Sequence, residues 1–459
     1  MKIKKIDVID LFDYYCYKIE MKEHDSISII HAPNGYGKTT VFKLITYLLD
    51  FDVISMSTIP FKKFTVELSD GSMMCVEKVI LEEDKPHRFI KEILSLKIVK
   101  EDGKIYEFSL PISSQVLPGI EEYGIEEYIR RMEIRRRHSP VEEREETINT
   151  EKKYERFKEQ LDIIRESCEV NFIDSNRLFS SDKQINRKEI VRLDKFGREE
   201  IVRKTSNRMF NEYQNSDSEN ENIVLDAKDI LHKIQLARQI YSLESEKKDR
   251  NFPDRLVEYV DLTKEFFSDI QVAEQLEELE KKRLELENAG LVLSGKKTLA
   301  PTKSIDDTMR KFYTLYIQDT LEKLSVYDKI KNKLELFIDI INTRTTFSNK
   351  YMRIDNERGV VFEPIESKSG KKHIIPLEKL SSGEKHDFIM FYELIFNSDG
   401  TSVFLIDEPE ISLHVAWQME FISVLERICE LNGTQAIVAT HSPDIVNGHD
   451  DLLISLGVE

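Results

Sequence analysis

The segment APNGYGKTT, residues 32–40, has the residue types and spacing that hold the phosphate chain of a nucleotide. Its two glycines allow the backbone to turn its N–H groups around the β-phosphate, and the start of a following helix adds a favourable dipole. Lys38 is predicted to bridge the β- and γ-phosphates. The Thr39 hydroxyl has the position expected to ligate Mg²⁺, and Thr40 is placed to contact the α-phosphate. The predicted nucleotide-binding residues are Asn34, Gly35, Gly37, Lys38, Thr39 and Thr40.

Two apolar runs nearer the C-terminus end in side chains that would complete such a site. TSVFLIDEPE has the pattern of a buried parallel strand that delivers Asp407 and Glu408 at its carboxyl edge. Asp407 would hold Mg²⁺ through its water shell, and Glu408 would orient the water that attacks the γ-phosphate. AIVATHSPD places His441 at the end of another apolar strand, where an imidazole can contact the γ-phosphate. Taken alone, an acidic strand end is common and a lone histidine is more often structural, so the catalytic interpretation depends on the phosphate-loop pattern.

The segment LSSGEK precedes a long apolar, helix-compatible stretch. Ser381, Ser382 and Gly383 would present hydroxyl and amide donors at a helix start, an arrangement suited to the γ-phosphate of a nucleotide bound by a second molecule. Serine before Gly-Glu is equally good material for a helix cap. The segment therefore has two interpretations, a contact made across a molecular interface and a cap.

The order of apolar and charged segments places these motifs in two α/β regions separated by a helical one. Residues 1–115 alternate strands with a helix around the phosphate loop. Residues 116–354 are mainly charged helical segments, with one strand near 170–176 and a short coiled-coil-like hairpin. Residues 355–459 return to alternating helix and strand. We predict an α/β nucleotide-binding head assembled from both chain ends, with a large, mainly helical insertion.

Composition excludes several classes of protein. The net charge of -18 over 459 residues argues against a chain whose whole surface wraps nucleic acid or lies on anionic lipid. No apolar run approaches the roughly 18 residues of a membrane helix, and Asp7 and Asp10 interrupt the N-terminal stretch that a secretory signal needs. The four cysteines are widely separated, which suggests neither a zinc site nor a disulfide framework. These features predict a cytoplasmic protein without a membrane partner.

Taken together and in this order, the four motifs resemble the Walker A, signature, Walker B and switch-histidine motifs of ABC-type ATPases. LSSGEK, with Glu384 rather than a glutamine, and the run DEPEISLH resemble the SMC, RecF and OLD branch more than transporter subunits. Within that branch the chain is most similar to the OLD-like AAA ATPases of bacterial antiphage defence, including the ATPase subunits of the Septu and PARIS systems. The resemblance covers about residues 1–115 and 355–459 and departs from the family's pattern at Ala32, where a glycine is usual.

The resemblance implies an ATPase that uses ATP and Mg²⁺ and works as a homodimer. Two ATP molecules would be sandwiched between two heads, each touching Lys38 of one head and Ser382 of the other. Glu410, Ser412 and His414 follow Walker B where the family places the D-loop that crosses the dimer seam. Hydrolysis would then require the pair of heads, and assembly into a higher oligomer stays open.

The resemblance also bears on the biological role. OLD proteins carry a metal-dependent nuclease domain of the TOPRIM type after the ATPase, whereas 18 residues, 442–459, follow His441 here. We therefore expect a sensor or switch subunit of an antiphage system that acts with a separate effector protein, a nuclease or toxin, and responds to a phage protein or a nucleic acid. Two alternatives are a RecF- or SMC-like DNA-repair clamp, and an ATP-stabilised oligomeric scaffold with little turnover.

Three further groups of residues leave their roles open. Tyr14, Tyr15 and Tyr17 lie where the resemblance places an adenine-stacking ring, although an aromatic side chain in an alternating strand is more often core. The candidates for the family's Q-loop glutamine are Gln115, Gln160 and Gln184. The resemblance also allows Asn176 and Arg177 to approach the nucleotide.

A cluster of five arginines stands out in the acidic insertion: Arg130, Arg131, Arg135, Arg136 and Arg137. Such a cluster is able to grip nucleic-acid phosphates. The run EEREE at 142–146 is able to neutralise it through helical ion pairs, and we favour this second interpretation.

Overall fold

The computed structural model describes most of the chain, in two compact units. The described residues are 1–22, 26–82, 90–112, 125, 129–130, 141–174, 189–193, 199–203, 218–262, 266–293, 295, 305–366, 373–411 and 413–456. One unit comprises Met1–Arg177 with Ser398–Glu459, and the other comprises Leu178–Asn397. The domain boundaries at 115/116 and 354/355 were predicted from the change between α/β and charged helical sequence patterns, and they stay predictions. The candidates that lie outside the described residues are Gln115, Gln184, Asn176, Arg177, Ser412, Arg131, Arg135, Arg136 and Arg137.

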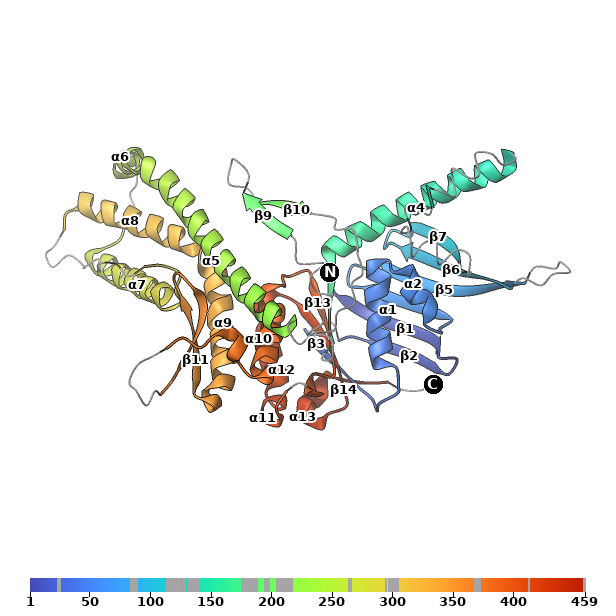
Figure 1. The fold of residues 1–459 in the computed structure, drawn as a ribbon. Helices are drawn as coiled ribbons and strands as arrows, with labels where there is room; N and C mark the ends of the chain where they lie inside the picture. The colour runs from blue at the N-terminus through green and yellow to red at the C-terminus, as the bar shows by residue number, and fades with distance from the viewer. Residues whose placement is uncertain are drawn as a thin grey trace. The chain divides into compact units, whose positions relative to one another are not determined.

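The centre of the first unit is a five-stranded, all-parallel sheet in the order β15-β3-β14-β13-β8 (Figure 1). Its strands are β3 Ile27–His31, β8 Glu169–Asp174, β13 Ser402–Asp407, β14 Gln435–Thr440 and β15 Leu453–Ser455. Every residue of β13 and β14 is buried, as is typical of parallel strands covered on both faces. The sheet combines strands from both chain ends, so the predicted α/β fold class is confirmed.

Two helices cover this sheet. Helix α1, Lys38–Asp50, packs against β8 and β13, whereas α12, Phe421–Asn432, packs against β3 and β14. Because the strands are parallel, the carboxyl ends of β3, β13 and β14 meet at one edge of the sheet. The three segments that carry the phosphate loop, the acidic pair and the histidine all begin there.

A second sheet of the first unit has six antiparallel strands in the order β2-β1-β4-β5-β6-β7 (Figure 1). These are β1 Ile3–Leu11, β2 Tyr15–Glu20, β4 Lys63–Leu68, β5 Met73–Glu82, β6 Ile90–Val99 and β7 Ile105–Ile112. One hydrophobic cluster joins this sheet to α1 and the parallel sheet through side chains such as Phe64, Phe42 and Val403. The turns at Gly71 and Gly103, both with positive φ, connect antiparallel neighbours, and the Asp-Gly pair in each is typical of hairpin turns.

The remaining helices of the first unit are short apart from α4. They are α2 Val53–Thr58, α4 Val141–Ser167, η4 Pro409–Ile411, α11 Val415–Gln418, α13 Pro443–Val446 and η5 Asp450–Leu452. Helix α4 packs on β6 and β7, where Tyr154 and Phe157 form an aromatic cluster with Phe51 and Phe108. No helix in the described part of the chain is long and apolar enough to cross a membrane.

The second unit is mainly helical. Its elements are β9 Glu189–Leu193, β10 Glu199–Arg203, α5 Ser218–Arg250, α6 Phe252–Leu262, α7 Asp269–Asn288, α8 Asp307–Ser325, α9 Asp328–Thr345, η2 Thr346–Ser348, β11 Lys350–Asp355, β12 Gly359–Pro364, η3 Leu377–Lys379 and α10 Ser382–Phe396. In α7 the side chains of Leu276, Leu279 and Leu286 are buried. The antiparallel hairpin of β9 and β10 was not foreseen from the sequence.

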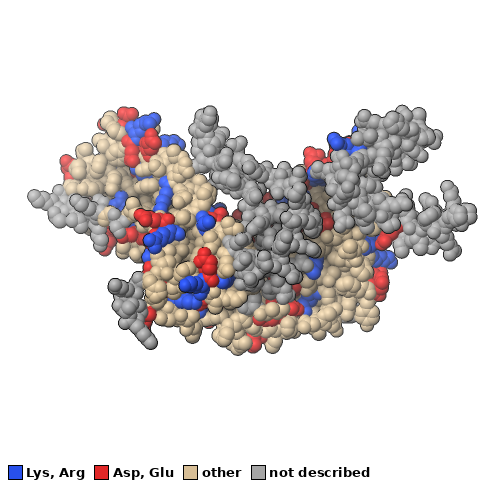
Figure 2. Space-filling view, viewed as in Figure 1, with Lys and Arg blue, Asp and Glu red and all other residues tan. Residues whose placement is uncertain are grey.

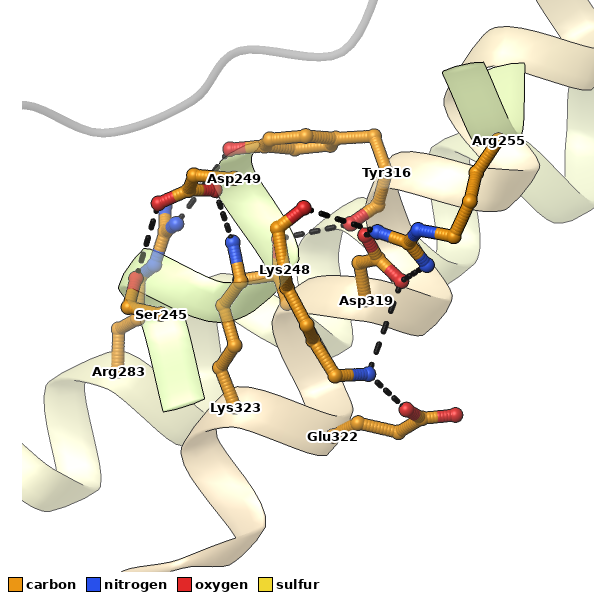
Figure 3. A network of polar contacts seen from close by, with 10 residues as sticks. Ser245, Lys248, Asp249, Arg255, Arg283, Tyr316, Asp319, Glu322 and Lys323 are labelled. Atoms are coloured by element: carbon orange, nitrogen blue, oxygen red, sulfur yellow. Dashed lines mark hydrogen bonds and ion pairs between the residues drawn. The ribbon is translucent and has the colours of Figure 1, made fainter. Parts of the chain in front are cut away.

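Ion pairs join the ends of α5, α6 and α8 (Figure 3). Asp319 of α8 is 4% exposed, accepts hydrogen bonds from the Arg255 guanidinium and faces Lys248 Nζ at 3.7 Å. Arg255 also donates to the Lys248 carbonyl at 3.2 Å and so satisfies an acceptor in the last turn of α5. In Figure 2, acidic and basic side chains are interspersed on the visible face of the described residues, with no continuous basic stripe.

Candidate nucleotide site

The phosphate loop leaves β3 after His31 and enters α1 at Lys38. Gly35 has φ +88° and Gly37, the residue preceding α1, has φ +77°, a left-handed conformation that side-chain-bearing residues rarely adopt. A Cβ at Gly37 would lie 3.0 Å from Leu11 Cδ2, whereas a Cβ at Gly35 would meet no atom within 4 Å. Gly37 is therefore required by both backbone and packing, and the space beside Gly35 is open.

Lys38 and Thr39 begin α1 with their polar atoms directed to different partners. The Lys38 side chain is buried, and its ammonium donates to the carbonyls of Ala32 at 2.6 Å and Pro33 at 3.3 Å. The Thr39 hydroxyl donates to Asp407 Oδ2 at 2.6 Å. This bond joins the phosphate loop to the end of β13, two segments that are 368 residues apart in the sequence. The geometry brings the two strongest sequence motifs into direct contact.

Asp407 lies in an acidic environment at the carboxyl edge of the sheet. The pKa of Asp407 is raised to about 6, first by burial and then by the charges of Glu408 and Asp174, against the lowering effects of the Thr39 hydroxyl and Lys38. Asp174 ends β8 directly beside Asp407 in the parallel register. Asp174 was not predicted as a site residue, although its segment VNFID is an apolar run ending in an acid, as is the run that ends at Asp407. Carboxylate and hydroxyl oxygens are the ligands that suit Mg²⁺, so the donor set of Thr39 and Asp407 fits this ion.

Glu408 and His441 face each other across the ends of β13 and β14. Glu408 has φ +45°, and its N–H donates to the Ala439 carbonyl at 2.8 Å. Its Oε1 lies 3.7 Å from His441 Nδ1, and both side chains are partly exposed. Glu410 Oε1 is closer, 3.0 Å from the same nitrogen. The His441 imidazole thus lies near two carboxylates, those of Glu408 and Glu410. The position of Glu410 beside the imidazole was not predicted from the sequence.

The other predicted residues lie in the loop, in α1 and in the tyrosine group at the start of β2. Asn34 is exposed in the loop and Thr40 lies in the first turn of α1. The Tyr17 hydroxyl donates to the Tyr36 carbonyl at 2.7 Å, and burial raises the pKa of Tyr17 to about 12. Tyr17 is therefore a core side chain that supports the loop backbone, whereas Tyr14 is 72% exposed. The ring of Tyr15 lies 5.0 to 5.6 Å, centre to centre, from the rings of three other tyrosines: Tyr14, Tyr17 and Tyr36.

Gln160, the described candidate for the Q-loop glutamine, lines a different site. It borders a wide, open surface depression of about 400 Å³ whose lining includes Asp70 and Glu101. No residue of the phosphate loop lines this depression. Arg130, the described member of the arginine cluster, lies in a helical stretch and is exposed.

The signature segment belongs to the second unit and begins α10. The Ser381 hydroxyl accepts from the Glu384 N–H at 3.3 Å, and the Glu384 carboxylate accepts from the Ser381 N–H at 2.7 Å, which together form a capping box. The helix-cap interpretation is thereby confirmed for Ser381. Ser381, Ser382 and Gly383 are all exposed, so the start of α10 presents hydroxyl and backbone donors to its surroundings.

Glu384 anchors this helix start to the neighbouring β11 and η2. It accepts from Lys350 Nζ at 2.6 Å and from the Ser348 hydroxyl at 2.5 Å. Burial alone would raise the pKa of Glu384, but hydrogen bonds from Lys350, Ser348 and the Ser381 N–H, together with the charge of Lys350, hold it below its ordinary value. The glutamate that distinguishes this signature from a glutamine version is therefore an ionised structural anchor.

Residues 208–447 match the protein family described as "AAA domain, putative AbiEii toxin, Type IV TA system". The match covers 240 of 459 residues, more than half of the chain, and includes the signature segment, Asp407, Glu408 and His441. The chain belongs to this family. The AAA ATPase domain is thereby confirmed, whereas the ABC-type motif roles and the OLD-like branch stay predictions.

Curated relatives match shorter stretches. UvrABC system protein A of Oceanobacillus iheyensis is 30% identical over 145 residues, which are 32% of this chain and 12% of that protein. The protein of the same name from Clostridium acetobutylicum is 26% identical over 157 residues, 34% of this chain and 13% of its own length. The chain thus spans about an eighth of the length of these relatives. A solved structure, "Crystal structure of the SmcHead bound to the C-winged helix domain of ScpA", aligns over 100% of this chain and 95% of that chain at 12% identity and a TM-score of 0.34.

Proposed function

We propose that this protein binds and hydrolyses ATP with Mg²⁺ at the edge of its parallel sheet. The observation that carries the proposal is the 2.6 Å hydrogen bond from Thr39 to Asp407, because it unites a phosphate loop with an acidic strand end. In P-loop ATPases these two groups lie on either side of the Mg²⁺ that accompanies the β- and γ-phosphates. The partly exposed Glu408 and His441 lie at the same edge of the sheet, each directly after one of two neighbouring strands.

Each side chain then has a defined task. Backbone N–H groups from Asn34 to Lys38 and the start of α1 hold the phosphates, where phosphate oxygens replace the loop carbonyls as partners of the Lys38 ammonium. Thr40 would contact the α-phosphate. Thr39, and Asp407 through water, would hold Mg²⁺, which when bound would supply neutralisation of the charge that develops on the phosphates. Glu408 orients the attacking water, and His441 contacts the γ-phosphate.

The exposed start of α10 supports a shared site in a homodimer. Ser382 and Gly383 present donors that are not used by the capping box of Ser381 and Glu384. A helix N-terminus of this kind favours an anion, and a γ-phosphate held by a second copy of the chain is such an anion. We infer that hydrolysis requires two heads, and that the ATP-bound dimer is the active state.

The role that we infer for this switch is that of the sensor subunit of a bacterial antiphage system. Its motifs resemble the OLD-like branch, and it is a member of a family whose description includes a toxin of a type IV toxin–antitoxin system. The effector would be a separate nuclease or toxin, and the trigger a phage protein or nucleic acid. Co-expression with genomic neighbours followed by a phage challenge tests this level of the proposal, and loss of protection in Lys38→Ala is the expected result.

The catalytic level is tested by light-scattering mass and phosphate release with and without Mg-ATP. Wild type should dimerise and turn over, Lys38→Ala should do neither, and Glu408→Gln should accumulate the ATP-bound dimer without turnover. An exposed-surface variant, Glu430→Gln on α12, is the matched control and should behave as wild type. Assembly that is identical in all variants and independent of ATP would instead identify a constitutive scaffold and refute the switch.

A further inference from the structure

His441 is held in one orientation by a carboxylate that follows the Walker B pair. Glu410 Oε1 accepts from the Thr440 hydroxyl at 2.7 Å and from the His441 backbone N–H at 3.0 Å. The same oxygen lies 3.0 Å from His441 Nδ1, closer than the 3.7 Å that separates this nitrogen from Glu408 Oε1. One oxygen atom therefore contacts the side chain before the histidine, its backbone and its ring.

The supporting contacts keep Glu410 itself in place. Its side chain is 7% exposed, in the turn η4 that directly follows β13. Gln418 Nε2 donates to the Glu410 carbonyl at 3.1 Å, and Gln418 Oε1 accepts from the Ser442 hydroxyl at 3.2 Å. Gln418 thus links the backbone of Glu410 to the residue after His441. Both sides of the histidine are connected to the segment that carries the acidic pair.

An imidazole that donates Nδ1–H to a carboxylate leaves its other nitrogen, Nε2, for a second partner. The His441 side chain is 42% exposed, so it retains access to such a partner. We propose that Glu410 is a positioning residue that fixes the proton of His441 on Nδ1 and directs Nε2 to the γ-phosphate. This inference rests on the proposed ATP hydrolysis at the same site. Glu410 can orient His441 without a second copy of the chain, because its contacts with Thr440 and His441 lie within one copy.

The test combines a spectroscopic and a kinetic readout. Two-bond ¹H–¹⁵N spectra of protein labelled on histidine nitrogen report which ring nitrogen carries the proton, and His441→Ala identifies the signal. Wild type should show the Nδ1–H form without any nucleotide, and Glu410→Ala should shift His441 toward the Nε2–H form. Because the spectra need no ATP turnover, they report the position of the His441 proton even if the chain does not hydrolyse ATP.

The kinetic arm compares Glu410→Ala with Glu410→Gln, which keeps an acceptor oxygen, and with the control Glu430→Gln. Glu410→Ala should lower kcat at least about tenfold with KM within about twofold, since misplacement of a catalytic group by 1 Å is sufficient for such losses. Glu410→Gln should recover most of the lost kcat. A wild-type His441 with its proton on Nε2 overturns the proposal, and so does a Glu410→Ala enzyme with unchanged kcat. Absence of turnover in wild type would refute the proposed function instead.

Discussion

Asp387 is a buried carboxyl on α10 whose ionisation opposes folding of the second unit. Its side chain is 14% exposed, and Arg344 Nε lies 3.9 Å from Oδ2, beyond hydrogen-bond distance. The pKa of Asp387 is raised from 3.8 to about 7, mainly by burial and to a smaller degree by the charge of Glu384, against the lowering effect of the Arg344 charge. We expect Asp387→Asn, which resembles the protonated acid, to stabilise the protein increasingly as the pH rises.

Proton linkage determines whether the contribution of Asp387 to folding stability rises or falls with pH. Because the folded-state pKa of Asp387 is raised above the unfolded value, its stabilising contribution is complete in acid and is lost as the pH rises through about 7. Between pH 5 and pH 8 this loss amounts to about 3 kcal/mol at 1.4 kcal/mol per pKa unit. For a unit of this size, such a change corresponds to a shift of roughly 6 to 12 °C in melting temperature.

Thermal melts from pH 5 to pH 8 of wild type, Asp387→Asn and Asp261→Asn provide the measurement. Asp261 is exposed on α6 and serves as the control for removal of a negative charge from the same unit. The melting temperature of Asp387→Asn should rise relative to wild type as the pH increases, whereas Asp261→Asn should follow wild type. Parallel curves for Asp387→Asn and wild type across this range would refute the argument from burial.

Three further predictions concern local contacts. Gly37→Ala should destabilise the protein by about 1 to 2 kcal/mol in chemical denaturation, because the residue has φ +77° and the methyl group would lie 3.0 Å from Leu11; an unchanged midpoint would contradict this. Asp319→Ala should cost about 1 to 2 kcal/mol in the same assay, since it removes the charge-assisted hydrogen bonds of Arg255, whose side chain is 35% exposed and can be solvated once its partner is lost. Tyr17→Phe removes the 2.7 Å hydrogen bond to the phosphate-loop backbone and should weaken ATP binding about fivefold in calorimetry; wild-type affinity would show that the loop does not need this support.

Loops, strands and helix caps that depend on a few contiguous residues were predictable from the sequence. The phosphate loop combines glycines, a lysine and hydroxyls within nine contiguous residues, and in the structure both glycines before α1 have positive φ. The buried strand β13 and the turns at Gly71 and Gly103 likewise follow from contiguous patterns. A helix cap at Ser381 was one of two interpretations of LSSGEK, and the residue types of this short segment were sufficient to suggest it.

Neighbouring residues encode loops, caps and strands, so the ATPase class and the segments that carry its motifs could be predicted before the fold was known. Which of these segments meet depends on the three-dimensional packing. The register of parallel strands places Asp174 beside Asp407, and the turn after β13 brings Glu410 to His441. Contacts of this kind depend on strand order and packing over hundreds of residues, for which a single sequence carries no local signal.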